Sequence, residues 1–236
     1  MLNFGEHMSF KEGDYIKIEY SAWRGSDKQL VFTTNEKLAK DNGIYNEKSS
    51  YKPQLVILGK KGTIRGLENI LMGMSVGEEK KAELEPKDAF GERNPELARV
   101  MHLSDFRKRD MDPYPGMQVD IDGTVATVKS INSGRVLVDA NHPLAGERMI
   151  YEVKVVEKIE DKKKMVEALA NDYSLFPDTV DVTPEKARFV FGSKQKKDPD
   201  YFINKTAAVD SIFDNIKDLR KVEVVEEYER EEKGKQ

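Results

Sequence analysis

The residue types that ordinarily do chemistry are scarce in this sequence. The chain has no cysteine, which excludes a thiolate nucleophile, a cysteine zinc site and a disulfide. His7, His102 and His142 stand alone, without the spacing of metal ligands, and we predict a structural or surface role for each. The glycine-rich run at residues 59–66 lacks the Gly-Lys-Ser/Thr ending of a phosphate-binding loop. We therefore expect no metal and no cofactor.

Apolar and aromatic side chains on short strands are the alternative source of chemistry. Residues 14–23 alternate, with Ile16, Ile18 and Tyr20 on one face, as a half-buried strand requires. Residues 53–58 form a compact apolar run, which predicts a central strand of the same sheet.

Two short helices are expected beside these strands. Thr33 and Glu36 have the spacing of a capping box, and Gly43 is a plausible end for the helix that they begin. A second helix is expected over residues 64–72, and residues 79–84 alternate as another strand. Strands around the modest helix at residues 64–72 indicate a curved antiparallel sheet of the α+β class.

The sequence changes character after residue 91. Residues 92–117 are rich in Met, Arg, Asp and Pro, and short strands are then expected at 118–122, 124–131 and 135–139. The Asp-Gly pair between the first two of these is a strong hairpin signal. This segment reads as a small all-β module, after which residues 149–159 return to a long strand.

A third unit of α+β type follows residue 159. Residues 161–172 and 199–219 have helical patterns, and strands are expected at 180–182, 188–191 and 222–228. The last residues form a charged tail that cannot bury a core.

Three stretches together resemble the FKBP family of peptidyl-prolyl cis/trans isomerases: IKIEYSAW (16–23), LGKKGTIRGLENILMGMSVGEEKKAELEPKDAFG (58–91) and NHPLAGERMIYEVKV (141–155). The order of the stretches resembles the SlyD-like and archaeal long forms, which carry an inserted flap domain and, in the archaeal case, a C-terminal extension. The resemblance implies a discontinuous isomerase domain at 8–91 and 144–159, an inserted domain at 92–143 and a C-terminal domain at 160–236.

The resemblance also implies an apolar pocket that binds Xaa-Pro segments of unfolded proteins. Its catalytic residues would be Tyr20, Phe32, Ile64, Phe90 and Tyr151. Its other substrate-binding residues would be Val31, Thr33, Thr63, Leu67, Leu144 and Ala145. Taken singly, each of these residues fits ordinary core packing; their coincidence at the motif positions favours the pocket.

Two positions depart from the family pattern. The family commonly has Phe-Asp before the first short helix, and here either Thr33 or Phe32 replaces the aspartate, depending on the alignment. Phe90 stands where many members have tyrosine. Both changes remove a polar group, so altered or reduced activity is expected. A rival reading is a holdase whose prolyl site has decayed, and a second rival is an interaction scaffold whose third domain docks on a larger machine such as the ribosome.

The inserted module is expected to bind unfolded chains, because methionine adapts to varied apolar partners. The residues proposed for this role are Met101, Phe106, Met111, Tyr114 and Met117, some of which must also form the module's own core. In the third unit, residues 222–225 could pair with a second copy of the chain, which makes a homodimer a hypothesis.

Composition also limits the classes of binding partner that we expect. The chain has 35% charged residues and a net charge of −4, which argues against a nucleic-acid partner. No stretch approaches the ~20 apolar residues of a membrane span. The start of the chain has no apolar signal segment, so we expect a cytoplasmic protein without a membrane partner.

Overall fold

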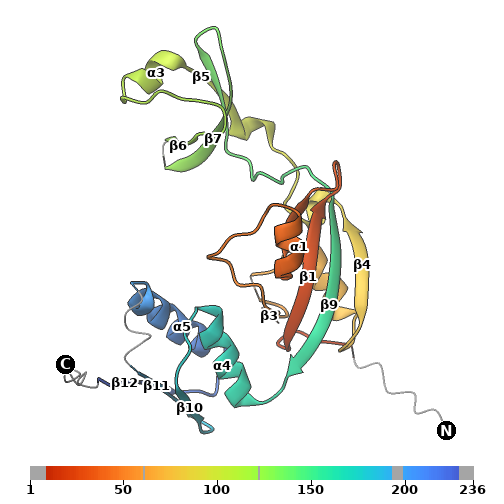
Figure 1. Ribbon diagram of the computed structural model, residues 1–236, viewed down its shortest axis with the longest axis vertical. Coiled ribbons are helices and arrows are strands. Elements are labelled where there is room, and N and C mark those ends of the chain that lie inside the picture. Colours follow the sequence, from red (N-terminus) through yellow and green to blue (C-terminus); the bar gives the residue numbers. More distant parts are fainter. Residues whose placement is uncertain (1–8, 61, 122, 193–198, 229–236) are drawn as a thin grey trace, which may run out of the picture.

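The computed structural model describes residues 9–60, 62–121, 123–192 and 199–228, which form three sheets arranged along the molecule (Figure 1). The first sheet has the order β2-β1-β9-β4, with β3 paired to β1. Its strands are β1 (Tyr15–Arg24), β2 (Leu30–Thr33), β3 (Gln54–Ile57), β4 (Glu79–Leu84) and β9 (Met149–Ile159). Its helices are α1 (Glu36–Asp41), α2 (Arg65–Met72) and the 3-10 turn η1 (Pro86–Asp88).

The core of this sheet follows from the alternation in β1 and β9. Ile16 and Ile18 are fully buried, and Ile18 lies opposite Val155 of β9 in the antiparallel register. Leu67 and Leu71 of α2 pack into the same apolar cluster. The helix α2 starts after Ile64 and ends at Gly73, as predicted.

The start of α1 is one correction to the sequence prediction. Asn35, not Thr33, is the N-cap, and its side-chain oxygen accepts a hydrogen bond from the Leu38 N–H at 2.9 Å. The hydroxyl of Thr33 is engaged elsewhere, with the hydroxyl of Ser21 at 2.8 Å. The predicted end is confirmed: Gly43 has φ +70°, in the left-handed conformation that suits glycine just after a helix.

The position of β3 is a second correction. The apolar run predicted a central strand, but β3 pairs only with β1 and lies at the sheet edge. Its residues Leu55 and Ile57 pack against the core of the C-terminal unit instead of a further strand. A strand covered by another unit can be apolar on both faces without being central.

The inserted sheet has the order β5-β8-β7-β6 in the described residues. Its strands are β5 (Ala98–His102), β6 (Gln118–Ile121), β7 (Thr124–Asn132) and β8 (Arg135–Asp139). The structure adds η2 (Pro95–Leu97), β5 and α3 (Leu103–Arg107), which the sequence analysis did not anticipate. The sheet packs on α3 through a small core that contains Phe106, Val128 and Val136. Asp122 of the predicted Asp-Gly turn lies outside the described residues.

The C-terminal unit has a three-stranded sheet, β10-β11-β12, and two helices. Its elements are α4 (Lys162–Asp172), β10 (Thr179–Val182), β11 (Lys186–Phe191), α5 (Tyr201–Asn215) and β12 (Lys221–Glu226). Strand β11 pairs with β10 antiparallel and with β12 parallel, so the predicted α+β class is confirmed. The core of this unit also takes in Tyr15 and Ile159 of the first sheet, so the two units share one apolar interface. In Figure 1 the insert and the C-terminal unit lie at opposite ends of the first sheet.

Candidate active site

Aromatic rings from separate segments of the chain meet at one end of the first sheet. Tyr20 of β1 and Tyr151 of β9 stack with their ring centroids 6.2 Å apart. Phe32 of β2 lies against Phe90, with centroids 6.4 Å apart, and Phe90 stacks almost parallel on the His142 imidazole at 4.6 Å. Stacked aromatic rings at these distances form a preorganised apolar surface.

The strand register explains why these rings can gather. Ala22 of β1 lies opposite Phe32 on one side and opposite Tyr151 on the other. Since Ala22 is small and fully buried, it leaves room for larger side chains on both neighbouring strands. The pairing of β1 with β2 and β9 therefore sets the spacing of the rings.

The loop after η1 places Phe90 at the edge of the insert. Gly91 has φ +83°, and its N–H donates to the Pro86 carbonyl at 2.7 Å, which closes the turn behind Phe90. The Gly146 N–H donates to the Gly91 carbonyl at 2.8 Å, so the chain leaves for the insert and returns from it at nearly the same point. Phe90 and His142 thus lie beside this junction.

Aliphatic residues fill the space behind the rings. Leu67, Leu144 and Tyr151 are buried in one cluster, against which Val31, Ile64, Tyr20 and Phe90 pack with partial exposure. The structure therefore brings most of the predicted pocket residues together. Ala145 is buried beside this cluster, and its N–H donates to the His142 carbonyl at 2.9 Å.

The two threonines of the predicted pocket lie apart from the rings. Thr33 is bound to Ser21, and Thr63 lines a groove between β3 and the helices of the C-terminal unit. Neither threonine side chain therefore extends the aromatic surface.

His142 is the site residue that the sequence analysis missed. Its Nδ1 accepts a hydrogen bond from the Leu144 N–H at 3.1 Å, which fixes the ring against Phe90. This nitrogen must be unprotonated to accept, so the neutral ring carries its proton on Nε2. The sequence feature that could have pointed to His142 is the motif that contains it, Asn-His-Pro-Leu-Ala-Gly, since no second histidine is spaced to pair with it.

The electrostatics of the cluster favour neutral groups. Burial raises the pKa of the Tyr20 phenol, and burial together with the neighbouring Tyr20 raises the pKa of Tyr151. Both phenols therefore remain uncharged well beyond neutral pH. A neutral, aromatic, partly desolvated site can bind an apolar ring and hold an amide away from water, without a nucleophile.

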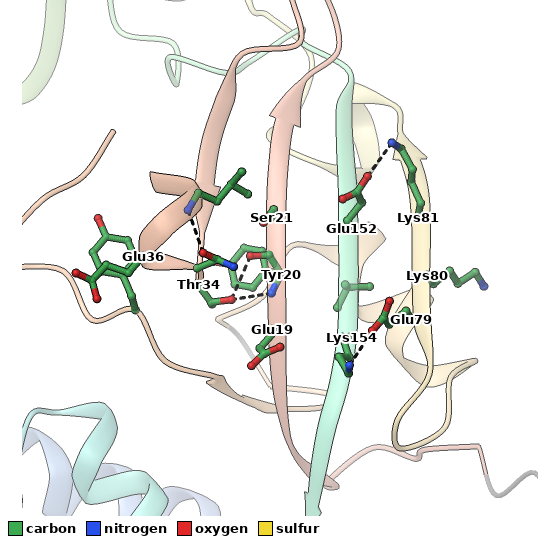
Figure 2. Close-up of a pocket in the computed structure, with 14 residues that line it drawn as sticks. Glu19, Tyr20, Ser21, Thr34, Glu36, Glu79, Lys80, Lys81, Glu152 and Lys154 are labelled. Carbon is green, nitrogen blue, oxygen red and sulfur yellow. Dashed lines mark hydrogen bonds and ion pairs between the residues drawn. The ribbon is translucent and has the colours of Figure 1, made fainter. Parts of the chain in front are cut away.

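A cavity of about 740 Å³ borders this cluster but has a different chemistry. Figure 2 shows the ion pairs Lys81–Glu152 and Lys154–Glu79 that join β9 and β4 along its wall, each 2.7 Å long. Of the five predicted catalytic residues, Tyr20 alone lines this cavity. We therefore place the candidate site at the aromatic rings and not in this charged cavity.

Among the described parts of the chain, no group of three or more His, Cys, Asp or Glu side chains could hold a metal ion. The same ranges contain no helix of sufficient length and apolarity to cross a membrane.

The residues predicted to bind clients divide between core and surface. Phe106 is only 2% exposed and belongs to the core of the insert, so the folded module does not present it to a partner. Met101, Met111 and Met117 are partly buried against that core, whereas Tyr114 is 62% exposed. Val100 and Val125 are also more than half exposed, although the sequence analysis did not single them out.

A sheet that carries a cluster of aromatic rings and is interrupted by an inserted sheet can now be compared with known proteins. Residues 7–104 match the family model of FKBP-type peptidyl-prolyl cis-trans isomerases, and residues 99–144 match the model described as FKBP26, IF domain. The short-type peptidyl-prolyl cis-trans isomerase of Methanocaldococcus jannaschii is 33% identical over 145 residues, which cover 61% of this chain and 91% of that protein. The chain therefore belongs to the FKBP-type peptidyl-prolyl cis-trans isomerases and carries an insert-in-flap (IF) domain.

Bacterial relatives show the same likeness over shorter stretches. The FKBP-type 16 kDa peptidyl-prolyl cis-trans isomerase of Escherichia coli is 33% identical over 111 residues, 45% of this chain and 74% of that protein. The SlyD isomerase of Pasteurella multocida is 28% identical over 120 residues, 49% of this chain and 60% of its own length. Neither matched family range extends into the C-terminal unit.

Proposed function

We propose that this isomerase binds the prolyl ring of its substrate among Tyr20, Phe32, Phe90 and Tyr151, over a floor formed by Leu67. The observation that carries the proposal is the convergence of rings from β1, β2, β9 and the loop after η1 on one apolar surface. Ile64 at the start of α2 and Leu144 at the return from the insert border the same surface. Of the other substrate-binding residues predicted from sequence, Val31 packs against this cluster and Ala145 is buried next to Leu144, whereas Thr33 and Thr63 do not extend the surface.

Such a surface suffices for the reaction. The prolyl bond rotates over a barrier of ~18–20 kcal/mol because the C–N bond has double-bond character. In the twisted transition state this resonance is lost, and the amide carries less charge separation than in the planar ground state. A desolvated apolar site therefore stabilises the twisted form relative to the planar one. Each ~1.4 kcal/mol of this difference accelerates the reaction tenfold.

A protease-free isomerisation assay on a short Xaa-Pro peptide tests the proposal. Tyr151→Leu keeps an apolar side chain in the core but removes the aromatic wall, and it should lower kcat/KM by at least about tenfold, equivalent to ~1.4 kcal/mol. Tyr45→Leu is the matched control, because Tyr45 stacks on Tyr51 outside the site and should leave kcat/KM unchanged. Equal losses in the two variants would refute this placement of the pocket. No acceleration by the intact folded protein would favour the holdase reading.

We further propose that the insert binds unfolded chains through its exposed apolar side chains. Tyr114, Val100 and Val125 are 61–63% exposed, which leaves contact area for an apolar client. The partly buried Met101, Met111 and Met117 lie next to the core and could adapt to the client. This division of labour assigns residues 92–143 to client binding, residues 8–91 and 144–159 to isomerisation, and residues 160–236 to a separate C-terminal domain.

A deletion tests the role of the insert. Because the Gly146 N–H bonds the Gly91 carbonyl, the two ends of the insert lie side by side, and joining residue 91 to residue 144 should leave the first sheet intact. The shortened chain should lose suppression of client aggregation and keep much of its catalysis on short peptides, because it lacks His142 but retains the rings of Tyr20, Phe32, Phe90 and Tyr151. Suppression that survives the deletion would contradict the assignment.

A homodimer through the C-terminal unit and a cytoplasmic location are part of the same proposal. Phe202 and Ile203 of α5 are 58% and 71% exposed, a large apolar area for a surface helix, and β12 lies at the edge of its sheet. A cysteine-free chain is compatible with a reducing compartment. Light scattering that gives a monomeric mass would contradict the dimer, and cell fractionation tests the location.

A further inference from the structure

A groove runs from the isomerase site onto the C-terminal unit. A cavity of about 560 Å³ has Tyr20, Thr33 and Thr34 of the first sheet along one wall. Its other wall comes from the C-terminal unit and includes Asp172, at the end of α4, and Phe176 in the loop that follows. Tyr20 therefore belongs both to the aromatic cluster and to this groove.

The groove continues past β3. A second cavity, of about 690 Å³, shares Gln54, Leu55 and Asp172 with the first and extends along α5 to Asp210 and Asp214. In Figure 1, α4 and α5 lie beside β3, and residues of these three elements line the second cavity. Cavities of a few hundred cubic ångströms each are of the size that holds several side chains of a ligand.

The chemistry of the walls suits an extended polypeptide. Phe176 is 53% exposed, and the Lys52 ammonium lies 5.6 Å from its ring centroid. Asp172 keeps contact with solvent, yet the surrounding walls desolvate its carboxyl and raise its pKa. Among the described residues, the Asp172 carboxylate has no hydrogen-bond or ion-pair partner. An aromatic face next to an unpaired carboxylate can hold an apolar side chain and a neighbouring basic one.

We propose that this groove binds the stretch of client polypeptide that continues from the prolyl bond, with an apolar side chain against Phe176 and a Lys or Arg side chain beside Asp172. The inference rests on the proposed prolyl site, because continuity through Tyr20 is what makes the flanking chain the occupant. A chain that leaves the aromatic rings toward Thr33 and Thr34 enters the groove directly. The C-terminal unit then extends substrate recognition beyond the residues that a short peptide can supply.

The test compares two peptides that share one central Xaa-Pro pair. One is a tetrapeptide; the other is extended on both sides to about twelve residues and carries Leu and Lys in its flanks. Phe176→Ala should leave kcat/KM for the tetrapeptide unchanged and lower it for the long peptide by about five- to tenfold, which corresponds to burial of the exposed half of the Phe176 ring. Phe213→Ala is the matched control, because Phe213 is also exposed in the same unit but does not line the groove.

The second variant addresses the charge. Asp172→Asn should abolish any preference for the Lys-containing long peptide over the same peptide with Ala in that position. Equal effects of Phe176→Ala on both peptides, or no effect on either, would overturn the groove proposal. A misplaced prolyl site would give a different result: Tyr151→Leu would then leave kcat/KM for the tetrapeptide unchanged, whatever the effect of Phe176→Ala on the long peptide.

Discussion

Tyr15 offers a sharp test of how the isomerase sheet is joined to the C-terminal unit. Its ring is buried in the core of that unit, although the residue belongs to β1 and lies opposite Ile57 and Ile159 in the first sheet. Its hydroxyl is buried and has no hydrogen-bond partner in the described residues. A buried, unsatisfied polar group costs roughly 1–3 kcal/mol. Tyr15→Phe keeps the ring and removes the hydroxyl, so it should stabilise the fold by about 1 kcal/mol at neutral pH.

The pH dependence makes the prediction specific to this residue. Burial raises the pKa of Tyr15 to about 12 from its ordinary value of 10.0. A raised pKa means that the stability due to the neutral phenol is fully present below pH 10 and is lost as the pH rises toward 12. The stability difference between the variant and the wild type should therefore grow across this window by on the order of 1–2 kcal/mol. Other tyrosines titrate in both proteins and cancel in the difference.

Urea unfolding followed by tryptophan fluorescence is the assay. The chain has a single tryptophan, Trp23, which lies in β1 with Tyr15 and reports on the same sheet. The urea midpoint should rise in Tyr15→Phe without a change in slope. A variant that is less stable than the wild type at pH 7 would show that the hydroxyl has a partner. A stability difference that stays constant from pH 9 to pH 12 would refute the burial argument.

Three further predictions follow from single contacts. Gly66→Ala should destabilise the fold by roughly 1–3 kcal/mol, because an added Cβ would lie 2.7 Å from both the Asp88 carbonyl oxygen and Leu84. The same variant should slow isomerisation, because it displaces the loop that carries Phe90. An unchanged urea midpoint would contradict this prediction. Asp139→Ala should cost about 1–3 kcal/mol in thermal unfolding of the insert, since this buried carboxylate binds Arg93 and accepts from the Asn141 side chain at 2.7 Å. Lys81→Ala removes an exposed ion pair with Glu152 and should change the free energy of unfolding by less than about 1 kcal/mol, so a larger loss would show a role beyond the surface.

The strands could be predicted because alternation is local. The pattern of Ile16 and Ile18 marks the inner face of β1 without knowledge of its neighbours. The outer face was misjudged where the C-terminal unit covers it. Tyr15 is buried in the core of that unit, and Leu55 and Ile57 pack against the same core with partial burial, although α4 is more than a hundred residues away in sequence. The prediction of β3 as a central strand was wrong for this reason.

Local signals also failed where two residues compete for one role. Thr33 has capping-box spacing with Glu36, but β2 extends to Thr33 and its hydroxyl bonds Ser21, so Asn35 caps α1 instead. The strand β5 and the helix α3 were missed because their sequence, rich in Met, Arg and Asp, has no clear period. Only the folded insert shows that Phe106 belongs to its hydrophobic core and not to its surface.

The candidate site depended on motifs more than on periodicity. The positions of Tyr20, Phe32, Phe90 and Tyr151 came from the family resemblance, and the structure brings their rings together. His142 could not be found by a search for ligand spacing, because its role is to stack on Phe90 and accept from a backbone N–H. Such a role depends on two loops meeting, which a single sequence does not encode locally.

The junction of the insert with the sheet would connect the proposed client binding to catalysis. Phe90 lies just before the crossing point marked by Gly91 and Gly146, and His142 lies just before the return. Under the proposed function, a client held on the exposed side of the insert would be tethered near the aromatic rings, and its prolyl bonds would reach them at a high effective concentration. The groove at the other end of the site would receive the flanking chain on the C-terminal unit. A polypeptide engaged at the insert, the rings and the groove gains from three weak contacts at once, whereas a short peptide gains from the rings alone.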